Sequence, residues 1–86
     1  MVLKGSAAKR YRQSQKRRMR NRVMRSRVRS EIRSFLEAVD GKDKSAAETR
    51  LQSVTKLIDT AAGKGVYHKN TAARTKSRLR KKLNAL

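Results

Sequence analysis

The sequence of 86 residues contains no cysteine, no proline and no tryptophan, and it has a single histidine. Without cysteine, the chain can form neither a disulfide nor a thiolate metal site. Without proline, no residue forces a break in a helix. No apolar run reaches membrane-spanning length, and the apolar residues at the N-terminus are too few for the core of a signal peptide. These absences exclude disulfide scaffolds and membrane-spanning helices.

Large apolar side chains are also scarce. Aromatic residues make up 3% of the sequence, and all hydrophobic residues together make up 36%. A chain of this length buries only a modest core, which here must be built mainly from Leu, Val, Ile, Ala and Met. This composition suits a small helical bundle better than a sheet, in which aromatic and β-branched residues predominate.

Acidic residues are few and unevenly placed. The chain has six of them against 25 Lys and Arg residues, which gives a net charge of +19. All six acids lie within residues 31–62, together with five basic residues. Residues 1–30 carry twelve Lys or Arg residues and residues 63–86 carry eight, with no acid in either segment. Two ends charged in this way repel each other unless an anion lies between them, so the distribution predicts a polyanionic partner.

The same scarcity argues against catalysis. One histidine, no cysteine and acids confined to the middle of the chain leave no combination of side chains suited to a catalytic or nuclease metal site. The segment Gly63-Lys64-Gly65 lacks the preceding strand and the spacing of a phosphate-binding loop. We therefore expect no enzymatic activity, no cofactor, no metal ion and no small-molecule substrate.

The longest predicted element is a helix over about 7–40. The 33 residues from Ala7 to Val39 contain neither proline nor glycine, and such a helix would be about 50 Å long. Its second half has apolar residues on one face, which predicts packing on a core: Met24, Val28, Ile32, Phe35 and Val39. Its first half carries basic residues on all sides, so we expect that half to contact a polyanion.

The ends of this helix have candidate capping residues. The residues up to Ser6 are expected to form a flexible lead-in, with Ser6 as a candidate cap. Gly41 is expected to take the left-handed conformation that ends many helices, within a tight polar connection to the next helix. Short connections of this kind join antiparallel neighbours.

A second helix is predicted over about 45–62. It would begin at a capping box, in which Ser45 and Glu48 satisfy each other's backbone N–H groups, and end at Gly63. One face of this helix is apolar, and Leu57 and Ala62 widen that face. The residues that form it are Ala47, Leu51, Val54, Ile58 and Ala61.

A third helix is predicted over about 70–84, with Asn70 or Thr71 as its cap. Gly65 supplies a permissive backbone position in the loop before it. The inward residues are expected to be Ala72, Leu79, Leu83 and Leu86. The residues grouped on the opposite side, as a basic ridge, are Asn70, Arg74, Ser77, Arg78 and Lys81.

Three apolar faces joined by short connections predict an all-α three-helix bundle in a single domain, residues 1–86. Because the first helix is nearly twice as long as the second, about 20 to 25 Å of it should overhang the bundle. Eight of the fourteen residues from Lys9 to Arg22 are basic, and like charges four residues apart oppose helix formation. We therefore expect the overhang to be only partly helical until anions bind to it.

Phosphate backbones are the favoured polyanion. Lys and Arg neutralise phosphates, and Arg adds a bidentate fork that Lys lacks. The near absence of aromatic residues argues against single strands bound by base stacking, so structured RNA or DNA fits better. Met19 and Val23, which interrupt the basic residues, are expected to contact either the nucleic acid or the end of the bundle.

Other uses of the basic segment stay open on composition alone. An architectural DNA-binding protein or a general RNA chaperone would rely on the same counterion release. A membrane-surface helix would also be basic, but residues 7–22 lack the Leu, Phe and Trp face that such helices bury. A mitochondrial transit peptide is also rich in Arg and Ser, yet here the basic segment continues without a break into the apolar stripe.

Four sequence blocks combine basic residues with small and polar ones at fixed spacing: Ser6-Ala7-x-Lys9-Arg10-x-Arg12, Arg20-Asn21-Arg22, Ser26-Arg27-Val28-Arg29, and Lys64-Gly65-Val66-Tyr67-His68-Lys69-Asn70-Thr71-Ala72-Ala73-Arg74-x-Lys76-Ser77-Arg78-Leu79. In these blocks the chain resembles the bacterial and plastid small-subunit ribosomal protein S-twenty family, over nearly its whole length. The last block is the specific one, because basic helices alone are a weak signal. Tyr67 stands where the family often has an aliphatic residue.

The resemblance implies a three-helix, non-enzymatic structural protein of the small ribosomal subunit. It implies direct binding to small-subunit (16S-type) ribosomal RNA, with Lys and Arg contacts to phosphates that tie RNA helices together. Its partners would be this RNA and other small-subunit components, with no membrane and no homo-oligomer, on the cytoplasmic ribosome of a bacterium or on an organellar ribosome.

The residues that the resemblance implies to face RNA are Lys9, Arg10, Arg12, Arg17, Arg20, Asn21, Arg22, Arg27, Lys64, His68, Lys69, Asn70, Arg74, Lys76, Ser77, Arg78 and Lys81. Helical spacing independently places five of them on the outer ridge of the third helix.

Overall fold

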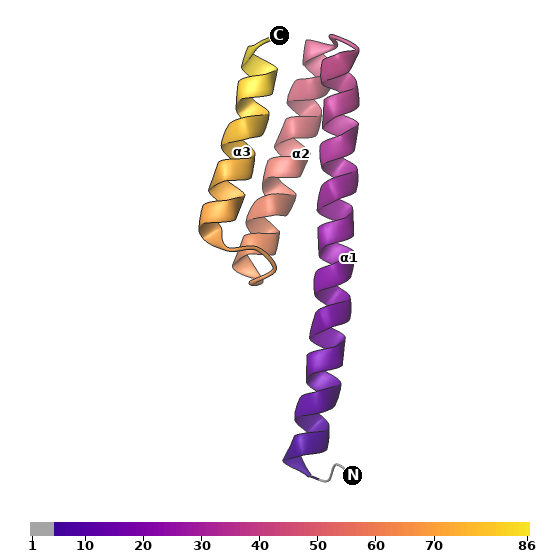
Figure 1. The fold of residues 1–86 in the computed structure, drawn as a ribbon. Helices are drawn as coiled ribbons and strands as arrows, with labels where there is room; N and C mark the ends of the chain where they lie inside the picture. The colour runs from indigo at the N-terminus through magenta and orange to yellow at the C-terminus, as the bar shows by residue number, and fades with distance from the viewer. Residues whose placement is uncertain (1–4) are drawn as a thin grey trace.

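A computed structural model describes residues 5–86 and shows three α-helices (Figure 1). Helix α1 spans Ser6–Asp40, α2 spans Lys44–Gly63 and α3 spans Lys69–Asn84. No strand occurs within the described residues. The predicted all-α three-helix fold is therefore confirmed, whereas most of the expected N-terminal lead-in lies outside the described part of the chain.

The long first helix overhangs the other two, as predicted. Helix α1 has 35 residues and α2 has 20, which correspond to lengths of about 52 Å and 30 Å. The second half of α1 packs along α2, and its first half continues as a straight helix past the connection between α2 and α3 (Figure 1). We call residues 9–22 of this overhang the arm. The chain measures 58 × 21 × 16 Å, so the arm accounts for much of its length.

Helix α2 lies at the centre of the packing. It supplies five of the nine buried hydrophobic residues found among residues 5–86, and both α1 and α3 pack against it, whereas α1 and α3 make few contacts with each other. The small side chains on α2 allow close approach of the neighbouring helices, which keeps a core with one Phe dense. The nine residues are Val28 and Phe35 of α1, Ala47, Leu51, Val54, Ile58 and Ala61 of α2, and Ala72 and Leu79 of α3.

A narrow groove of about 100 Å³ remains between α1 and α3. It follows from the central position of α2, because the outer helices are each held against α2 rather than against each other. We call it the α1–α3 groove, and its lining residues are Val28, Arg29 and Ile32 of α1, Ile58 of α2, Tyr67 of the connection, and Thr71, Ala72 and Thr75 of α3.

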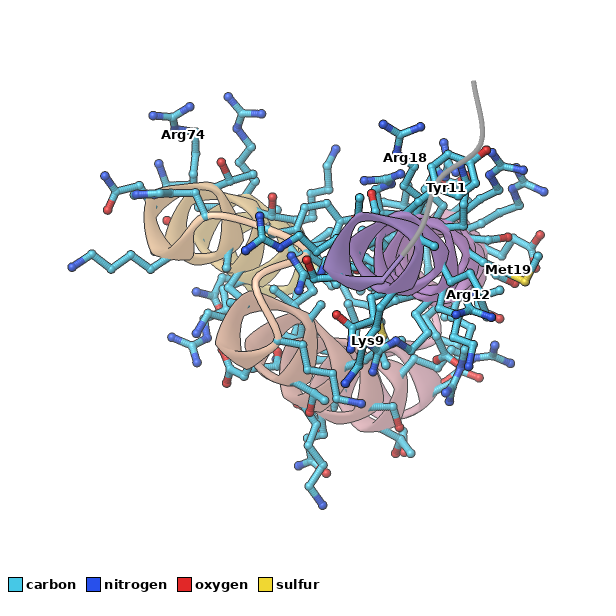
Figure 2. The ribbon with its side chains drawn as sticks, turned by 90° about the horizontal axis from the view of Figure 1, so that it is seen from below. Lys9, Tyr11, Arg12, Arg18, Met19 and Arg74 are labelled. Carbon is cyan, nitrogen blue, oxygen red and sulfur yellow. The ribbon has the colours of Figure 1, made fainter. Side chains whose placement is uncertain are left out.

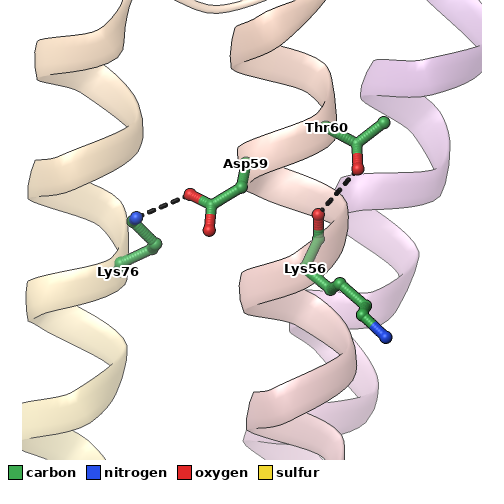
Figure 3. A network of polar contacts seen from close by, with 4 residues as sticks. All are labelled: Lys56, Asp59, Thr60 and Lys76. Carbon is green, nitrogen blue, oxygen red and sulfur yellow. Dashed lines mark hydrogen bonds and ion pairs between the residues drawn. The ribbon is translucent and has the colours of Figure 1, made fainter.

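Two side-chain contacts join neighbouring helices. The Lys76 Nζ of α3 lies 2.6 Å from the Asp59 Oδ1 of α2 (Figure 3). The Arg50 Nη1 of α2 donates to the Ser34 Oγ of α1 at 2.6 Å. Within α2, the Thr60 hydroxyl donates to the Lys56 carbonyl oxygen at 2.9 Å (Figure 3). The first two contacts link α2 to each of its neighbours at the surface of the bundle, outside the buried core.

The predicted ends of α1 were wrong in detail. Ser6 is the first residue of the helix rather than its cap, and Gly5 precedes it with no side-chain capping bond. Gly41 has φ of −77°, and its N–H donates to the Glu37 carbonyl oxygen at 3.0 Å, so it continues the helical pattern. The positive φ of 56° falls on the next residue, Lys42. The chain therefore reverses one residue later than the glycine suggested.

The caps of α2 and α3 also differ from the prediction. Helix α2 starts at Lys44, and the Asp43 carboxylate accepts the Ala46 N–H at 3.1 Å, so the capping box predicted at Ser45 lies inside the helix. Helix α3 starts at Lys69, and the cap is His68 rather than Asn70 or Thr71. In both cases an earlier side chain reaches the first unsatisfied N–H groups, which starts the helix one residue sooner.

Leu86 was wrongly predicted to point into the core. Helix α3 ends at Asn84, so helical spacing no longer applies at Leu86, and its side chain is 38% exposed.

Gly65, in the loop before α3, has a φ of +78°. This left-handed conformation is one that glycine adopts without steric cost, as expected for a permissive position in the loop.

Candidate nucleic-acid interface

The basic residues of α1 are exposed and have no carboxylate to pair with. Every Lys and Arg from Lys9 to Arg33 is exposed, and the acidic residues of the chain begin only at Glu31. Among the described residues, the only ion pair joins Lys76 to Asp59. The positive charge of α1 is therefore available to an external anion along more than half of the helix.

The arm presents this charge on all sides. Seen from its N-terminal end, Arg18 and Tyr11 point to one side of α1, Arg12 points to a second side next to Met19, and Lys9 points to a third (Figure 2). Among residues 5–86, no second helix runs alongside the arm (Figure 1). Such a segment can be contacted by phosphates from several directions at once.

A hollow of about 600 Å³ lies in the corner between the arm and the end of the bundle. We call it the corner hollow. Seven of its nine lining residues lie within residues 17–27 of α1, and the other two lie in the connection between α2 and α3. They are Arg17, Met19, Arg20, Asn21, Val23, Met24, Arg27, Lys64 and Val66. The overhang thus creates the hollow, because α2 ends beside the C-terminal end of the arm (Figure 1).

Met19 and Val23 do not enter the buried core. Their side chains are 67% and 55% exposed, and both line the corner hollow beside Met24 and Val66. Met24 and Val66 are half-buried and pack against the core. The hollow therefore has an apolar lining that runs from the core outwards and a rim of cationic and amide side chains.

The outer face of α3 forms a second exposed basic surface. We call it the α3 ridge, and its members, all exposed, are Asn70, Arg74, Ser77, Arg78 and Lys81. They lie on the side of α3 opposite the buried Ala72 and Leu79. In Figure 2, Arg74 of this ridge and Arg18 of the arm point towards the same side of the molecule.

His68 is positioned at the start of the α3 ridge by its capping role. Its Nδ1 accepts the Asn70 N–H at 3.1 Å, so the proton of the neutral ring is carried by Nε2. The residue is exposed. The Nε2–H group can therefore donate to an external acceptor, such as a phosphate oxygen, while Nδ1 holds the helix end.

The comparisons with known proteins agree with this surface chemistry. The sequence profile described as Ribosomal protein S20 matches residues 4–84 of the chain. The chain belongs to the ribosomal protein S20 family. The family resemblance expected from the sequence is thus confirmed, and members of this family are structural components of ribosomes rather than enzymes.

Three bacterial relatives align with most of this chain. The "Small ribosomal subunit protein bS20" of Syntrophus aciditrophicus is 48% identical over 85 residues, which are 99% of this chain and 96% of the relative. The protein of the same name from Corynebacterium efficiens is 47% identical over 81 residues, or 94% of this chain and 93% of the relative. A third, from Rhodopirellula baltica, is 50% identical over 74 residues and covers 86% of this chain and 82% of the relative.

For this S20 family member, the structure groups most of the predicted RNA-facing residues into three places. The corner hollow brings together Arg17, Arg20, Asn21, Arg27 and Lys64. The α3 ridge, with His68 and Lys69 at its start, holds a second group. Lys9, Arg10, Arg12 and Arg22 lie on the arm outside the hollow. Their contact with RNA stays a prediction.

Lys76 is separated from the other predicted residues. Its Nζ is bound to Asp59 on α2, and 25% of its side chain is exposed. It points from α3 towards α2 (Figure 3), whereas the α3 ridge lies opposite the buried residues of that helix. An RNA contact by Lys76 would have to compete with this ion pair.

Four exposed arginines of α1 are missing from the predicted set. With Arg22 they recur at intervals of four, three, four and four residues, which places five guanidinium groups on one face of the helix. We call this face the arginine row: Arg18, Arg22, Arg25, Arg29 and Arg33. Arg29 also lines the α1–α3 groove. The spacing is present in the sequence, and three of the five arginines lie beyond the arm, on the half of α1 that packs on the bundle.

Two other kinds of feature are absent from the described part of the chain. Residues 5–86 contain no group of three or more His, Cys, Asp or Glu side chains that could hold a metal ion. Within the same residues, no helix is both long and apolar enough to cross a bilayer.

Proposed function

We propose that this chain, as a structural protein of the small ribosomal subunit, binds small-subunit ribosomal RNA directly and holds separate RNA segments together. The proposal rests on one observation: a single small protein presents three separate basic surfaces. The corner hollow, the α3 ridge and the arginine row are all exposed, and among the described residues none of their cations is ion-paired.

The binding chemistry is neutralisation of phosphates. Each Lys or Arg that contacts a phosphate releases a condensed counterion, which favours binding at low salt. Arginine can donate two parallel N–H bonds to one phosphate, which also fixes its orientation. The neutral donors Asn21, Asn70 and Ser77 suit phosphate, ribose or base edges. Binding would therefore combine strong electrostatics with a smaller number of oriented contacts.

The shape of the molecule determines which RNA segments can be joined. The arm extends about 20 to 25 Å beyond the bundle, whereas the α3 ridge lies on the opposite outer helix (Figure 1). RNA bound around the arm and RNA bound along α3 need not belong to the same helix. The chain would act as a monomer that links them, alongside other small-subunit components, on the cytoplasmic ribosome of a bacterium, as its bacterial relatives suggest.

A direct comparison of ligands tests the proposal. The affinity of the full chain is measured for a fragment of small-subunit ribosomal RNA and for duplex DNA with the same number of phosphates, at two salt concentrations. We expect the RNA fragment to be preferred, with the preference growing at the higher salt, where sequence-independent attraction is weaker. Equal affinities at high salt would favour a general DNA-binding protein or RNA chaperone and overturn the proposal.

A further inference from the structure

The corner hollow has an apolar lining as well as cations. Phosphate binding alone would require only the cations. Met24 and Val66 form its inner part, and Val23 and Met19 extend the apolar lining into solvent. Met19 points away from α2 and α3 (Figure 2), and because it lines the hollow but is 67% exposed, it forms the outer edge. An apolar surface left exposed on a chain of net charge +19 indicates a contact surface rather than a structural need.

The positive charge at the rim of the hollow favours an anionic partner. Arg17, Arg20 and Arg27 come from α1, Lys64 from the loop after α2, and Asn21 adds an amide with both donor and acceptor atoms. No acidic residue lines the hollow. Its occupant must therefore carry negative charge at the rim and present a flat or rounded apolar group to the inside.

A nucleotide with an unpaired base meets both requirements. In a continuous duplex the bases are stacked inside and the phosphates lie outside, so no apolar group can project into a recess. An extruded base projects from the backbone, and its neighbouring phosphates remain outside the recess. Resting on the proposed function, we propose that the corner hollow takes up one unpaired base of the bound RNA.

The lining residues have distinct roles in this site. The thioether of Met24 contacts the aromatic ring of the base, an interaction that sulfur makes favourably, and Met19 with Val23 covers the outer edge of the site. The Asn21 amide bonds to the polar edge of the base, as amide side chains do in base recognition. Arg17, Arg20 and Lys64 hold the phosphates on either side.

The site selects the RNA structure rather than a long sequence. Extruding a base from a duplex costs a few kcal/mol, and the cost is least for a base that is already unpaired. The hollow therefore prefers a bulge or an internal loop over a continuous duplex. The arginine row and the α3 ridge contact phosphates, which bulged and fully paired RNA both present. These contacts therefore do not distinguish a bulge from a continuous duplex.

The test uses the full chain and three RNA hairpins of equal charge: one with a single bulged 2-aminopurine, one with an abasic residue at the bulge, and one fully paired. We expect the bulged base to be bound best and the other two to be bound equally. The double variant Met19→Ala, Val23→Ala changes two exposed side chains, so the fold should be retained. It should weaken binding of the bulged RNA by roughly threefold to tenfold and leave the paired RNA unchanged.

The fluorescence of 2-aminopurine gives a second measurement. The wild type should change the emission of the bulged base, and the double variant should lose most of that change. Tyr11→Ala is the matched control, because Tyr11 is an exposed arm residue that does not line the hollow; it should leave the ratio of bulged to paired affinity unaltered. Arg17→Gln should weaken all three RNAs alike.

Two outcomes contradict the inference in different ways. If the wild type binds all three hairpins equally, with normal salt dependence, the hollow takes no base while the proposed RNA-binding function stands. If none of the hairpins nor the ribosomal RNA fragment is bound in a salt-dependent manner, the proposed function fails together with the inference.

Discussion

Replacing four arginines of the arginine row is expected to lower the salt dependence of RNA binding by about three units of slope. The variant carries Arg18→Gln, Arg25→Gln, Arg29→Gln and Arg33→Gln. All four residues are exposed and belong to no ion pair within the described chain, so each can contact one phosphate. Each contact contributes about 0.7 to 0.9 to the slope of log K against log salt. Glutamine keeps a good helix propensity, so the helix itself should be retained.

The assay is a series of Kd measurements with the ribosomal RNA fragment over a range of salt concentrations. The matched control replaces four other exposed basic residues by Gln: Lys42, Lys44, Lys56 and Lys82. Both variants lower the net charge by four, from +19 to +15, but the control residues lie outside the three basic surfaces. We expect the control to change the slope by less than about one unit. Equal losses in both variants would show that only the total charge matters, and that the arginine row is not a contact surface.

Four further predictions concern stability and order. Phe35→Ala removes a fully buried ring and should lower the free energy of unfolding by about 3 to 5 kcal/mol in denaturant titration; a loss below about 1 kcal/mol would mean that Phe35 is not central to the core. His68→Ala removes the cap on the Asn70 N–H and should cost about 1 kcal/mol, whereas His68→Asn should restore stability without restoring any RNA contact of the ring. Asp59→Asn breaks a half-exposed ion pair with Lys76 and should cost less than about 1 kcal/mol in thermal unfolding. The arm is helical in the structure, but repulsion among its like charges should make it fray in the free chain at low salt. RNA should restore the helix, seen as a gain in far-UV circular dichroism, and full helicity of the free chain at low salt would contradict this.

The main features of the fold follow from local sequence patterns. The absence of glycine and proline between Ala7 and Val39, together with the apolar stripes, is sufficient to predict three helices and an overhang. These signals depend only on residues within a few turns of each other. Because the first stripe stops near Met24, the point where α1 leaves the bundle could also be predicted.

The helix ends and the site geometry required information from outside each helix. Asp43 and Ser45 are both good caps, as are His68 and Asn70, and the path of the loop decides which side chain reaches the N–H groups. The ion pair of Lys76 depends on how far α3 is shifted along α2, which no local pattern specifies. The corner hollow requires the arm and Val66 to meet, although they are far apart in the sequence.

The central position of α2 has a consequence for how the chain folds. Each large helix interface joins elements that are consecutive in the sequence, α1 with α2 and α2 with α3. The native contacts are thus mostly short-range, and proteins with such low contact order fold in microseconds to milliseconds. The two helical hairpins share α2, so either can form first and provide a surface for the remaining helix. Low contact order therefore favours rapid assembly of the bundle, whereas repulsion between its two charged ends opposes it until an anion binds.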